Sequence, residues 1–242
     1  QEGSDTSCYG VAFDIGTTTV VGMLWNLETG ELVDVETRTN YQSLYGADVI
    51  SRIAYSFEDE ANLGILQSKA IQCCNEILEE ICERSGIEPS FILDAAFDGN
   101  TTMTHLALGV TPRSMSRTPF APVFCEAQNV SAQSLRLAIN PCANAHFLPI
   151  IAGHVGSDIV GMMIAADVDR IPGSHVAIDI GTNGEVVAVK DGQMMCCSTA
   201  AGPAFEGATI LFGMRAAPGA IERVTIGEDG VTIGTIEDEE PV

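Results

Sequence analysis

The chain has 242 residues, 46% of them hydrophobic and 18% charged, which is typical of a folded globular protein and excludes an intrinsically disordered one. Its 11 lysines and arginines against 33 aspartates and glutamates give a formal net charge of −22, so we expect no binding to nucleic acid or anionic membranes. No apolar run approaches the ~20 residues of a membrane span and no secretory signal opens the sequence, so we expect a cytoplasmic protein. The first residue is not Met, and we expect a segment of a longer polypeptide.

Three strands are predicted near the beginning of the chain. Residues 10–14 are a short apolar run, residues 18–25 are β-branched and apolar, and residues 31–39 alternate apolar with polar side chains. The Glu-Thr-Gly sequence at 28–30 predicts a tight hairpin turn between the last two strands.

Two helices are predicted next. Apolar residues recur at three- and four-residue steps over 45–55 and again over 63–81. Gly86 is placed to end the second helix as a C-cap.

The middle of the chain mixes strand, helix and irregular segments. Residues 92–97 have the apolar character of a buried strand, and a helix is predicted after them that extends to residue 108. Residues 112–122 are interrupted by prolines and predicted to be irregular, and residues 158–166 predict another apolar helix.

The opening pattern then returns. Residues 175–184, HVAIDIGTNG, repeat the design of residues 9–18, YGVAFDIGTT, in which a strand ends in Asp, Gly and Thr. Further strands are predicted at 185–190, 193–198, 223–227 and 231–236. The duplication predicts an α/β protein of two lobes that face each other across a cleft, the first spanning residues 9–170 and the second beginning at residue 171 and continuing to 242.

The repeated turns, which we call the first loop (residues 14–19) and the second loop (residues 179–184), have the chemistry of a phosphate site. Gly16 and Gly181 let the backbone approach a ligand closely, and successive amides in such a turn bind phosphate oxygens. Asp14 and Asp179 are placed to hold Mg²⁺. The other predicted nucleotide contacts in these loops are Thr17, Thr18, Thr19, Thr182, Asn183 and Gly184. The sequence therefore predicts binding of Mg-ATP between two loops, without a Walker-type P-loop, whose motif is absent.

Four further residues each have two interpretations. Glu185 either orders an attacking water as a general base or faces solvent. Asn100 either caps the helix after it or contributes to the cleft, where a helix N-terminus favours phosphate. Gly202 and Glu206 either belong to a strand-to-helix turn or lie on the cleft wall near the nucleotide or the partner.

The eight cysteines form no pattern that holds a metal or a cluster. No C-x-x-C pair occurs, and Cys73-Cys74 and Cys196-Cys197 are adjacent, which suits a disulfide framework poorly. We therefore expect free thiols in a reducing compartment, and neither a zinc nor an iron–sulfur site in this segment.

From about residue 9 to its end the chain resembles a known group of ATPases. The two loops are similar to the phosphate-1 and phosphate-2 motifs of the acetate-and-sugar-kinase, heat-shock chaperone and actin superfamily. Within it, the chain looks most like the ATP-dependent reductive activators of corrinoid proteins. The stretches that carry this likeness are 14–19, 45–52, 99–103, 179–185, 201–207 and 213–222.

The resemblance implies two ribonuclease-H-like lobes, the second one incomplete in this segment. It implies an ATP-hydrolysing enzyme that returns the cobalt of a corrinoid protein from inactive Co(II) to Co(I). The electron would come from an iron–sulfur domain of the same polypeptide, which, like the adenosine-binding segment, is not expected in this stretch. By the same likeness Ser198 is a candidate contact for the cobalt of the client protein. The corrinoid protein is the expected partner, and a homodimer stays open.

Two other functions remain as alternatives. One is a small-molecule kinase or an ATP-dependent hydrolase of the hydantoinase kind. The other is non-catalytic, either a nucleotide-binding interaction module or a scaffold. ATP consumption that a metabolite stimulates without any protein client would favour the kinase or hydrolase. Absence of Mg-ATP binding would favour the non-catalytic alternative.

Overall fold

The structure is a computed structural model that describes residues 8–181, 183–200, 219–227, 230–236 and 239–241. The chain divides into two compact units. The first unit holds the described residues up to Ala177 together with Val187–Cys197, and the second holds Ile178–Val186 together with the described residues from Ser198 onward. The division into lobes at residue 170 stays a prediction.

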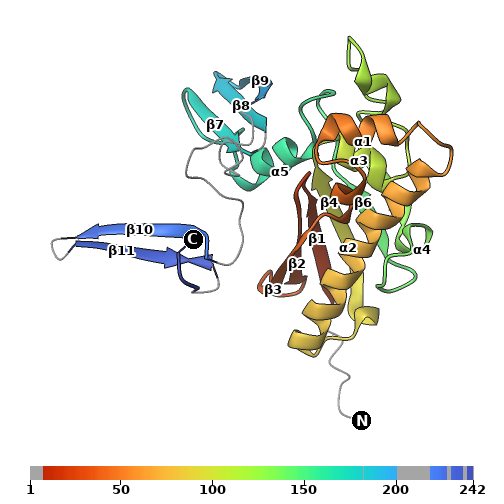
Figure 1. Cartoon of the computed structure of the whole chain (residues 1–242), viewed down its shortest axis with the longest axis horizontal. Coiled ribbons are helices and arrows are strands. Elements are labelled where there is room, and N and C mark those ends of the chain that lie inside the picture. Colours follow the sequence, from red (N-terminus) through yellow and green to blue (C-terminus); the bar gives the residue numbers. More distant parts are fainter. Residues whose placement is uncertain (1–7, 182, 201–218, 228–229, 237–238, 242) are drawn as a thin grey trace. The chain divides into compact units, whose positions relative to one another are not determined.

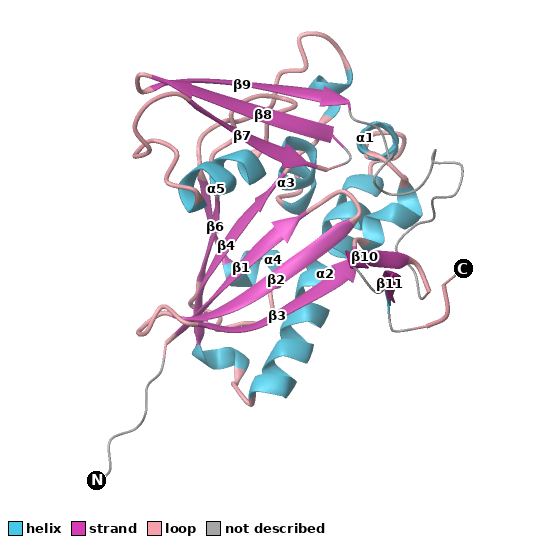
Figure 2. Cartoon of the chain, turned by 90° about the vertical axis from the view of Figure 1, so that its left-hand side faces the viewer, coloured by secondary structure: helices cyan, strands magenta, loops and turns pink. Residues whose placement is uncertain are grey.

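A six-stranded mixed sheet forms the centre of the first unit, in the order β3-β2-β1-β4-β6-β5 (Figures 1 and 2). The strands are β1 (Tyr9–Ile15), β2 (Thr19–Asn26), β3 (Leu32–Thr39), β4 (Ile92–Gly99), β5 (Gln128–Ser131) and β6 (Asn144–Phe147). β1, β4 and β6 run parallel to one another, whereas β2, β3 and β5 run antiparallel to their neighbours. A three-stranded antiparallel meander continued by parallel strands is the ribonuclease-H-like arrangement, and the predicted α/β fold class is confirmed.

The predicted hairpin turn between β2 and β3 is confirmed. The Asn26 side chain accepts hydrogen bonds from the backbone N–H groups of Glu28 and Thr29 at 2.9 and 3.1 Å. Gly30 has a φ of +73°, which is the left-handed conformation that glycine adopts most readily. The side chain of Asn26 and the conformation of Gly30 therefore account for this turn locally.

Short and long helices connect these strands. The α-helices of this unit are α1 (Val49–Tyr55), α2 (Asn62–Ser85), α3 (Thr101–Ala107), α4 (Ala132–Leu135) and α5 (Ser157–Ala165). The 3-10 helices are η1 (Tyr41–Tyr45), η2 (Pro89–Phe91) and η3 (Arg113–Ser116). None of the helices in the described residues is long and apolar enough to cross a membrane.

The prediction of one helix over 45–55 is wrong at its start. The segment instead divides into η1 and α1, because Asp48 begins α1 with a capping box. The Asp48 carboxylate accepts from the Ser51 N–H at 2.8 Å, and the Ser51 hydroxyl accepts from the Asp48 N–H at 3.1 Å. By contrast, α2 ends where expected, at Gly86, whose φ is +69° and whose N–H bonds to the Cys82 carbonyl at 2.9 Å.

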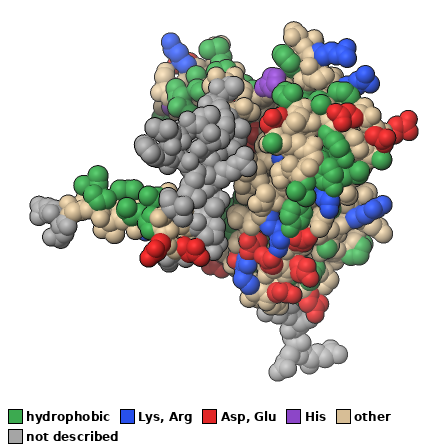
Figure 3. All heavy atoms as spheres, in the orientation of Figure 1, with side chains coloured by type: hydrophobic (Ala, Val, Ile, Leu, Met, Phe, Trp, Pro, Cys, Tyr) green, Lys and Arg blue, Asp and Glu red, His purple; other side chains and the backbone are tan. Residues whose placement is uncertain are grey.

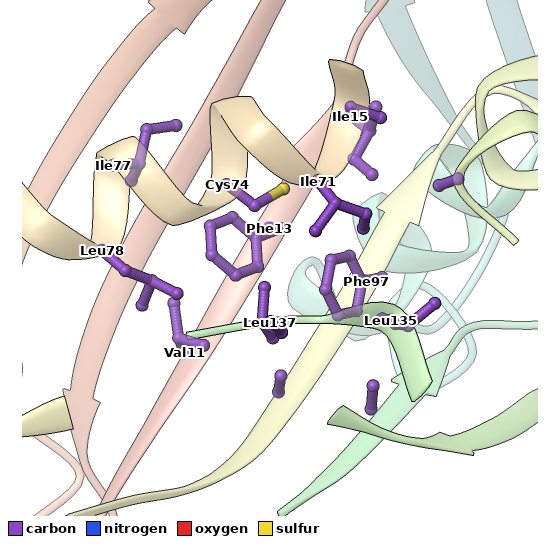
Figure 4. Close-up of a cluster of buried hydrophobic side chains, with 14 of the residues drawn as sticks. Val11, Phe13, Ile15, Ile71, Cys74, Ile77, Leu78, Phe97, Leu135 and Leu137 are labelled. Carbon is purple, nitrogen blue, oxygen red and sulfur yellow. The ribbon is translucent and has the colours of Figure 1, made fainter. Parts of the chain in front are cut away.

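α2 covers one face of the sheet and closes the main core (Figure 4). Alternate residues of β1 point into this core, and aromatic rings continue it across the parallel strands: Phe13 stacks on Phe97 at 5.1 Å, and Phe97 on Phe147 at 4.5 Å. The labelled core residues are Val11, Phe13, Ile15, Ile71, Cys74, Ile77, Leu78, Phe97, Leu135 and Leu137. Each fully buried large side chain contributes roughly 1.5–3 kcal/mol, so the core holds the ends of β1 and β4 firmly in place.

Charged side chains occupy the outside of this unit. Acidic side chains with a few basic ones gather over the end that holds the C-terminal part of α2 (Figure 3). The ion pairs here join Arg38 to Glu76 and Glu80, and Arg84 to Asp34 and Glu36. Exposed pairs of this kind are each worth about 0–1 kcal/mol, so the apolar core, and not these charges, fixes the fold.

The later strands form two smaller sheets. β7 (His175–Ile180), β8 (Asn183–Lys190) and β9 (Gln193–Ala200) make a three-stranded sheet in the order β7-β8-β9. β10 (Ile221–Gly227) and β11 (Gly230–Thr235) form an antiparallel hairpin. The strands predicted from the sequence in this region are all present, with ends that differ by a few residues.

Candidate functional site

The first loop begins where β1 and β4 end side by side. In the register of this parallel pair Asp14 lies opposite Asp98, and Ile15 lies opposite Gly99. Phe13 and Phe97 face α2, so the next residue on each strand, an aspartate in both cases, points to the other face of the sheet. Two carboxylates therefore leave the same face of neighbouring strands, which are separated by about 4.8 Å.

Close backbone approach explains the glycines at this place. The Gly16 N–H donates to the Thr19 carbonyl at 2.9 Å, and a Cβ on Gly16 would lie 2.6 Å from that oxygen. Gly99 has a φ of +145°, and a Cβ there would lie 2.5 Å from the Ile15 carbonyl oxygen. The turn and the two strand ends can pack this tightly because neither position carries a side chain.

Donors from outside the turn hold the carbonyl groups of the first loop. The Asn40 side chain donates from Nδ2 to the Gly16 carbonyl at 2.8 Å, and its backbone N–H donates to the Thr18 carbonyl at 2.8 Å. Arg52 donates from Nη2 to the Thr17 carbonyl at 2.6 Å. A trans peptide directs its N–H opposite to its C=O. Each of the three successive carbonyls is thus held by a donor from residue 40 or 52, and the N–H of the same peptide, at residue 17, 18 or 19, is directed away from that donor.

Asn100 caps α3, the first of the two roles considered for it, whereas a role in binding phosphate stays a prediction. Its Oδ1 accepts from the Met103 N–H at 3.1 Å, which caps α3, and its Nδ2 donates to the Thr17 hydroxyl at 2.9 Å. Ser157, at the first turn of α5, supports the same region by donating to the Gly99 carbonyl at 3.0 Å. Residues far apart in the sequence thus fix the position of the first loop.

In the second unit, three predicted site residues belong to the ends of neighbouring strands. Asp179 is near the end of β7, Glu185 near the start of β8 and Ser198 near the end of β9. Ser198 donates its hydroxyl hydrogen to Glu185 Oε1 at 2.8 Å. Burial raises the pKa of Glu185, and the nearby negative charge of Asp179 raises it further, whereas the hydrogen bond from Ser198 lowers it. Glu185 is half-buried and hydrogen-bonded, and its role as a general base stays a prediction.

Two family models match consecutive parts of the chain. The RACo middle region matches residues 9–171, and the C-terminal domain of RACo, described as the ASKHA domain, matches residues 174–242. The chain belongs to the RACo family. This confirms the resemblance found in the sequence, because ASKHA is the acetate-and-sugar-kinase, heat-shock and actin class of fold.

Two curated proteins and one solved structure are similar to this RACo-family chain. It is 35% identical over 228 residues to the corrinoid activation enzyme RamQ of Eubacterium limosum, covering 94% of the chain and 38% of that protein. It is 26% identical over 232 residues to the [Co(II) methylated amine-specific corrinoid protein] reductase of Methanosarcina barkeri, a match that covers 88% of this chain and 40% of that protein. A structure of the reductive activator for corrinoid, iron–sulfur protein superposes with a TM-score of 0.88 at 37% identity, over 99% of this chain and 38% of that one. The chain spans less than half the length of these relatives.

Some predicted site residues of this RACo-family chain lie outside the described residues, namely Thr182, Gly202 and Glu206. Among those that are described, the Gly181 N–H donates to the Asn183 carbonyl at 3.0 Å, which closes the turn of the second loop before Gly184 continues β8. A joint site of the first and second loops stays a prediction. No group of three or more His, Cys, Asp or Glu side chains converges to hold a metal in the described residues.

Three residues at the first loop escaped the sequence analysis as individual site residues: Asn40, Arg52 and Asp98. Asn40 donates to a backbone carbonyl 24 positions earlier in the chain, and Arg52 to one 35 positions earlier. No local sequence pattern reveals such contacts. Asp98 could have been found from the sequence, since it ends a buried strand in the same way as Asp14.

Proposed function

We propose that this chain is the nucleotide-binding core of an ATP-driven enzyme that restores a corrinoid protein from Co(II) to Co(I). The observation that supports the proposal is the first loop, whose carbonyls are held by Asn40 and Arg52, so the N–H groups of the same peptides are directed away from these two residues. Membership of the RACo family supports this use of the loop.

The first loop suits the phosphates of Mg-ATP. The amides of Thr17, Thr18 and Thr19 would bind phosphate oxygens, as successive amides do in other anion-binding turns. The oxygen donors of Asp14 and its neighbour Asp98 fit Mg²⁺, which prefers carboxylate ligands and keeps several waters. When bound, Mg²⁺ would neutralise part of the phosphate charge, which matters in a chain of formal charge −22.

The second loop would complete the nucleotide site. We propose that Asp179 shares in holding Mg²⁺, that Gly181, Asn183 and Gly184 contact phosphate through backbone groups, and that Glu185 orients the water that attacks the terminal phosphate. A raised pKa suits a carboxylate that takes up a proton near neutral pH. Thr182, Gly202 and Glu206 are proposed as further nucleotide contacts.

The client would be a corrinoid protein, as the names of the relatives indicate for those proteins. One electron converts Co(II) to Co(I), and we propose an iron–sulfur cluster outside this chain as its source. ATP hydrolysis to ADP and phosphate would supply the free energy for this uphill step. Ser198 is proposed to contact the cobalt: its hydrogen is directed to Glu185, which leaves the lone pairs of its oxygen available to another ligand.

The test uses the full-length protein with a corrinoid protein in the Co(II) state and a chemical reductant, and follows Co(I) by its absorbance. We expect Co(I) to form with Mg-ATP and not with a non-hydrolysable analogue. Formation that is indifferent to ATP would contradict the proposal. If ATP is consumed only when a small metabolite is added, the protein is a kinase or hydrolase instead. If Mg-ATP does not bind, it is a non-catalytic scaffold.

A further inference from the structure

Arg52 is the largest fully buried side chain of the described residues, and the mechanism above does not use its charge. In the described part of the chain Arg38, Arg84 and Arg170 form ion pairs, and Arg52 forms none. Burial lowers the pKa of Arg52 to about 10, partly offset by the attraction of Asp48. The guanidinium therefore stays charged at neutral pH in a place where water does not reach it. A buried cation that lacks a carboxylate partner is unfavourable for folding, so its presence calls for an explanation.

The hydrogen bonds of Arg52 go to two backbone carbonyls, to the Met103 sulfur and, from Nη1 at 3.5 Å, to Gln42 Oε1. Nε donates to the Gly46 carbonyl at 2.8 Å, Nη2 to the Thr17 carbonyl at 2.6 Å, and Nη1 lies 3.2 Å from Met103 Sδ. Gly46 leaves the space for this contact, because a Cβ there would lie 2.9 Å from Arg52 Cγ. One planar guanidinium thus bridges α1, the segment before it and the first loop.

We propose that Arg52 is a positioning residue for phosphate recognition, and that it acts through the Thr17–Thr18 peptide without touching the nucleotide. The inference rests on the proposed binding of Mg-ATP at the first loop. The guanidinium fixes the Thr17 carbonyl, so the Thr18 N–H is directed to the opposite side. A charged donor on the carbonyl also polarises the peptide, which makes its N–H a stronger donor in the low-dielectric interior. A neutral side chain would supply neither effect to the same extent.

The test compares Arg52→Gln and Arg52→Lys in the full-length protein. Calorimetry gives the affinity for Mg-ATP, competition against Mg-ATP gives that for adenosine, and the unfolding temperature is measured alongside. Arg52→Gln is expected to weaken Mg-ATP binding about tenfold or more, the loss typical of a hydrogen bond to a charged group. Adenosine, which has no phosphate, should bind with an affinity that changes by less than about twofold, because the inference acts only on phosphate contacts.

Arg52→Lys is the milder variant. Lysine keeps the charge, yet its single ammonium cannot bridge the Thr17 and Gly46 carbonyls in the geometry of a guanidinium. We expect a folded protein with an intermediate loss of Mg-ATP affinity and unchanged adenosine affinity. The matched control is Arg84→Gln, which removes an arginine of the same unit that pairs with Asp34 and Glu36 on the surface. It should leave both affinities unchanged.

Two results would overturn the inference. One is a folded Arg52→Lys or Arg52→Gln protein with wild-type affinity for Mg-ATP. The other is an equal loss of affinity for Mg-ATP and adenosine, which would make Arg52 a general structural residue. Failure of the proposed function looks different, since the wild-type protein would then not bind Mg-ATP at all.

Discussion

The first and second loops share the sequence Asp-Ile-Gly-Thr, but the structure supports them in different ways. The first loop is held by side chains from elsewhere in its unit, Asn40, Arg52 and Asn100. In the second loop, the described residues show the turn bond from Gly181 to Asn183 and, on the following strands, the pair of Ser198 and Glu185. A short motif therefore sets the turn, whereas the surrounding fold decides how firmly it is held.

The strands that lead into the two loops also differ in how deeply they are buried. β1 lies inside a sheet, between β2 and β4, and its apolar residues Val11, Phe13 and Ile15 are at most 2% exposed. β7 is the edge strand of its sheet, and Val176, Ile178 and Ile180 are 57–67% exposed. The effects of substitutions at the first loop should for this reason extend to the buried core and lower the stability of the protein. The effects of substitutions at the second loop should remain local.

The largest expected effect is loss of the first carboxylate. Asp14→Asn keeps the shape of the side chain but removes the charge proposed to hold Mg²⁺, and metal-site substitutions typically cost about 10–100-fold in affinity or activity. We expect ATP-dependent Co(I) formation by the full-length protein to fall about 100-fold. Asp179→Asn, measured in parallel, shows whether the second loop contributes equally.

Asp94→Asn is the matched control for Asp14→Asn. Asp94 is an exposed carboxylate of β4 that lies opposite Gly10, at the other end of the same strand pair. Its replacement should leave the activity unchanged. Wild-type activity in Asp14→Asn would show that the first loop is not part of the nucleotide site.

Replacement of the loop glycines by alanine should affect stability differently in the two loops. A Cβ on Gly16 would lie 2.6 Å from the Thr19 carbonyl oxygen, whereas the nearest atom to a Cβ on Gly181 among the described residues is the Asn183 oxygen at 3.4 Å. Overpacking of a tight site costs about 1–3 kcal/mol, so Gly16→Ala should destabilise the protein by that amount. Gly181→Ala should change stability by less than about 0.5 kcal/mol.

Denaturant unfolding of the two alanine variants measures this difference. Equal effects of Gly16→Ala and Gly181→Ala would show that the two turns are held alike. A selective loss in Gly16→Ala would support the view that the first loop is the one packed against a rigid core.

The sequence predicted the parts of this molecule that depend on local pattern. An apolar run identified β1, β-branched and apolar residues identified β2, and alternation identified β3. The turn at 28–30 followed from its residues, and duplication identified both loops. The start of α1 was missed because the Asp48 cap outweighs the apolar spacing before it. Arg52 was missed for a deeper reason: its partner is a backbone carbonyl 35 residues away, and every residue type offers the same carbonyl. Only the folded sheet brings that partner into reach.

A smaller effect is expected at the second loop from Ser198→Ala. The Ser198 hydroxyl stabilises the ionised form of Glu185, so its removal raises the pKa of Glu185 beyond the increase that burial already causes. If ionised Glu185 orients the attacking water, the acidic limb of the ATPase pH profile should move to higher pH. Loss of one such hydrogen bond is worth about 1 kcal/mol, or nearly one pH unit.

Thr199→Ala is the control for this shift, because Thr199 is the neighbouring hydroxyl residue on β9 and is exposed. Its ATPase profile should overlay that of the wild-type protein. A Ser198→Ala profile that also overlays the wild type would mean that Glu185 is not the base.

The smallest expected effect is an acid sensitivity of the first unit at His105, on α3. Nε2 of His105 accepts from the Val123 N–H at 3.0 Å, so its other nitrogen carries the hydrogen and donates to the Thr101 carbonyl at 2.7 Å. The ring is thus neutral, it stacks on Phe124 at 4.4 Å, and burial lowers its pKa below the ordinary value. Above about pH 6.5 the His105 ring is neutral in the unfolded chain as well, and its full contribution to the free energy of unfolding is present. Below that pH the ring binds a proton in the unfolded chain before it does so in the folded protein.

Stability should therefore fall as the pH drops from 6.5 towards the lowered pKa of His105, with a slope of at most about 1.4 kcal/mol per pH unit from this group. Unfolding temperatures of wild type and His105→Gln between pH 8 and pH 5 measure it. The variant should be less stable at pH 8, because it loses the Val123 contact, but should lose less stability on acidification. Parallel curves for the two proteins would show that His105 is not the group whose titration destabilises the protein.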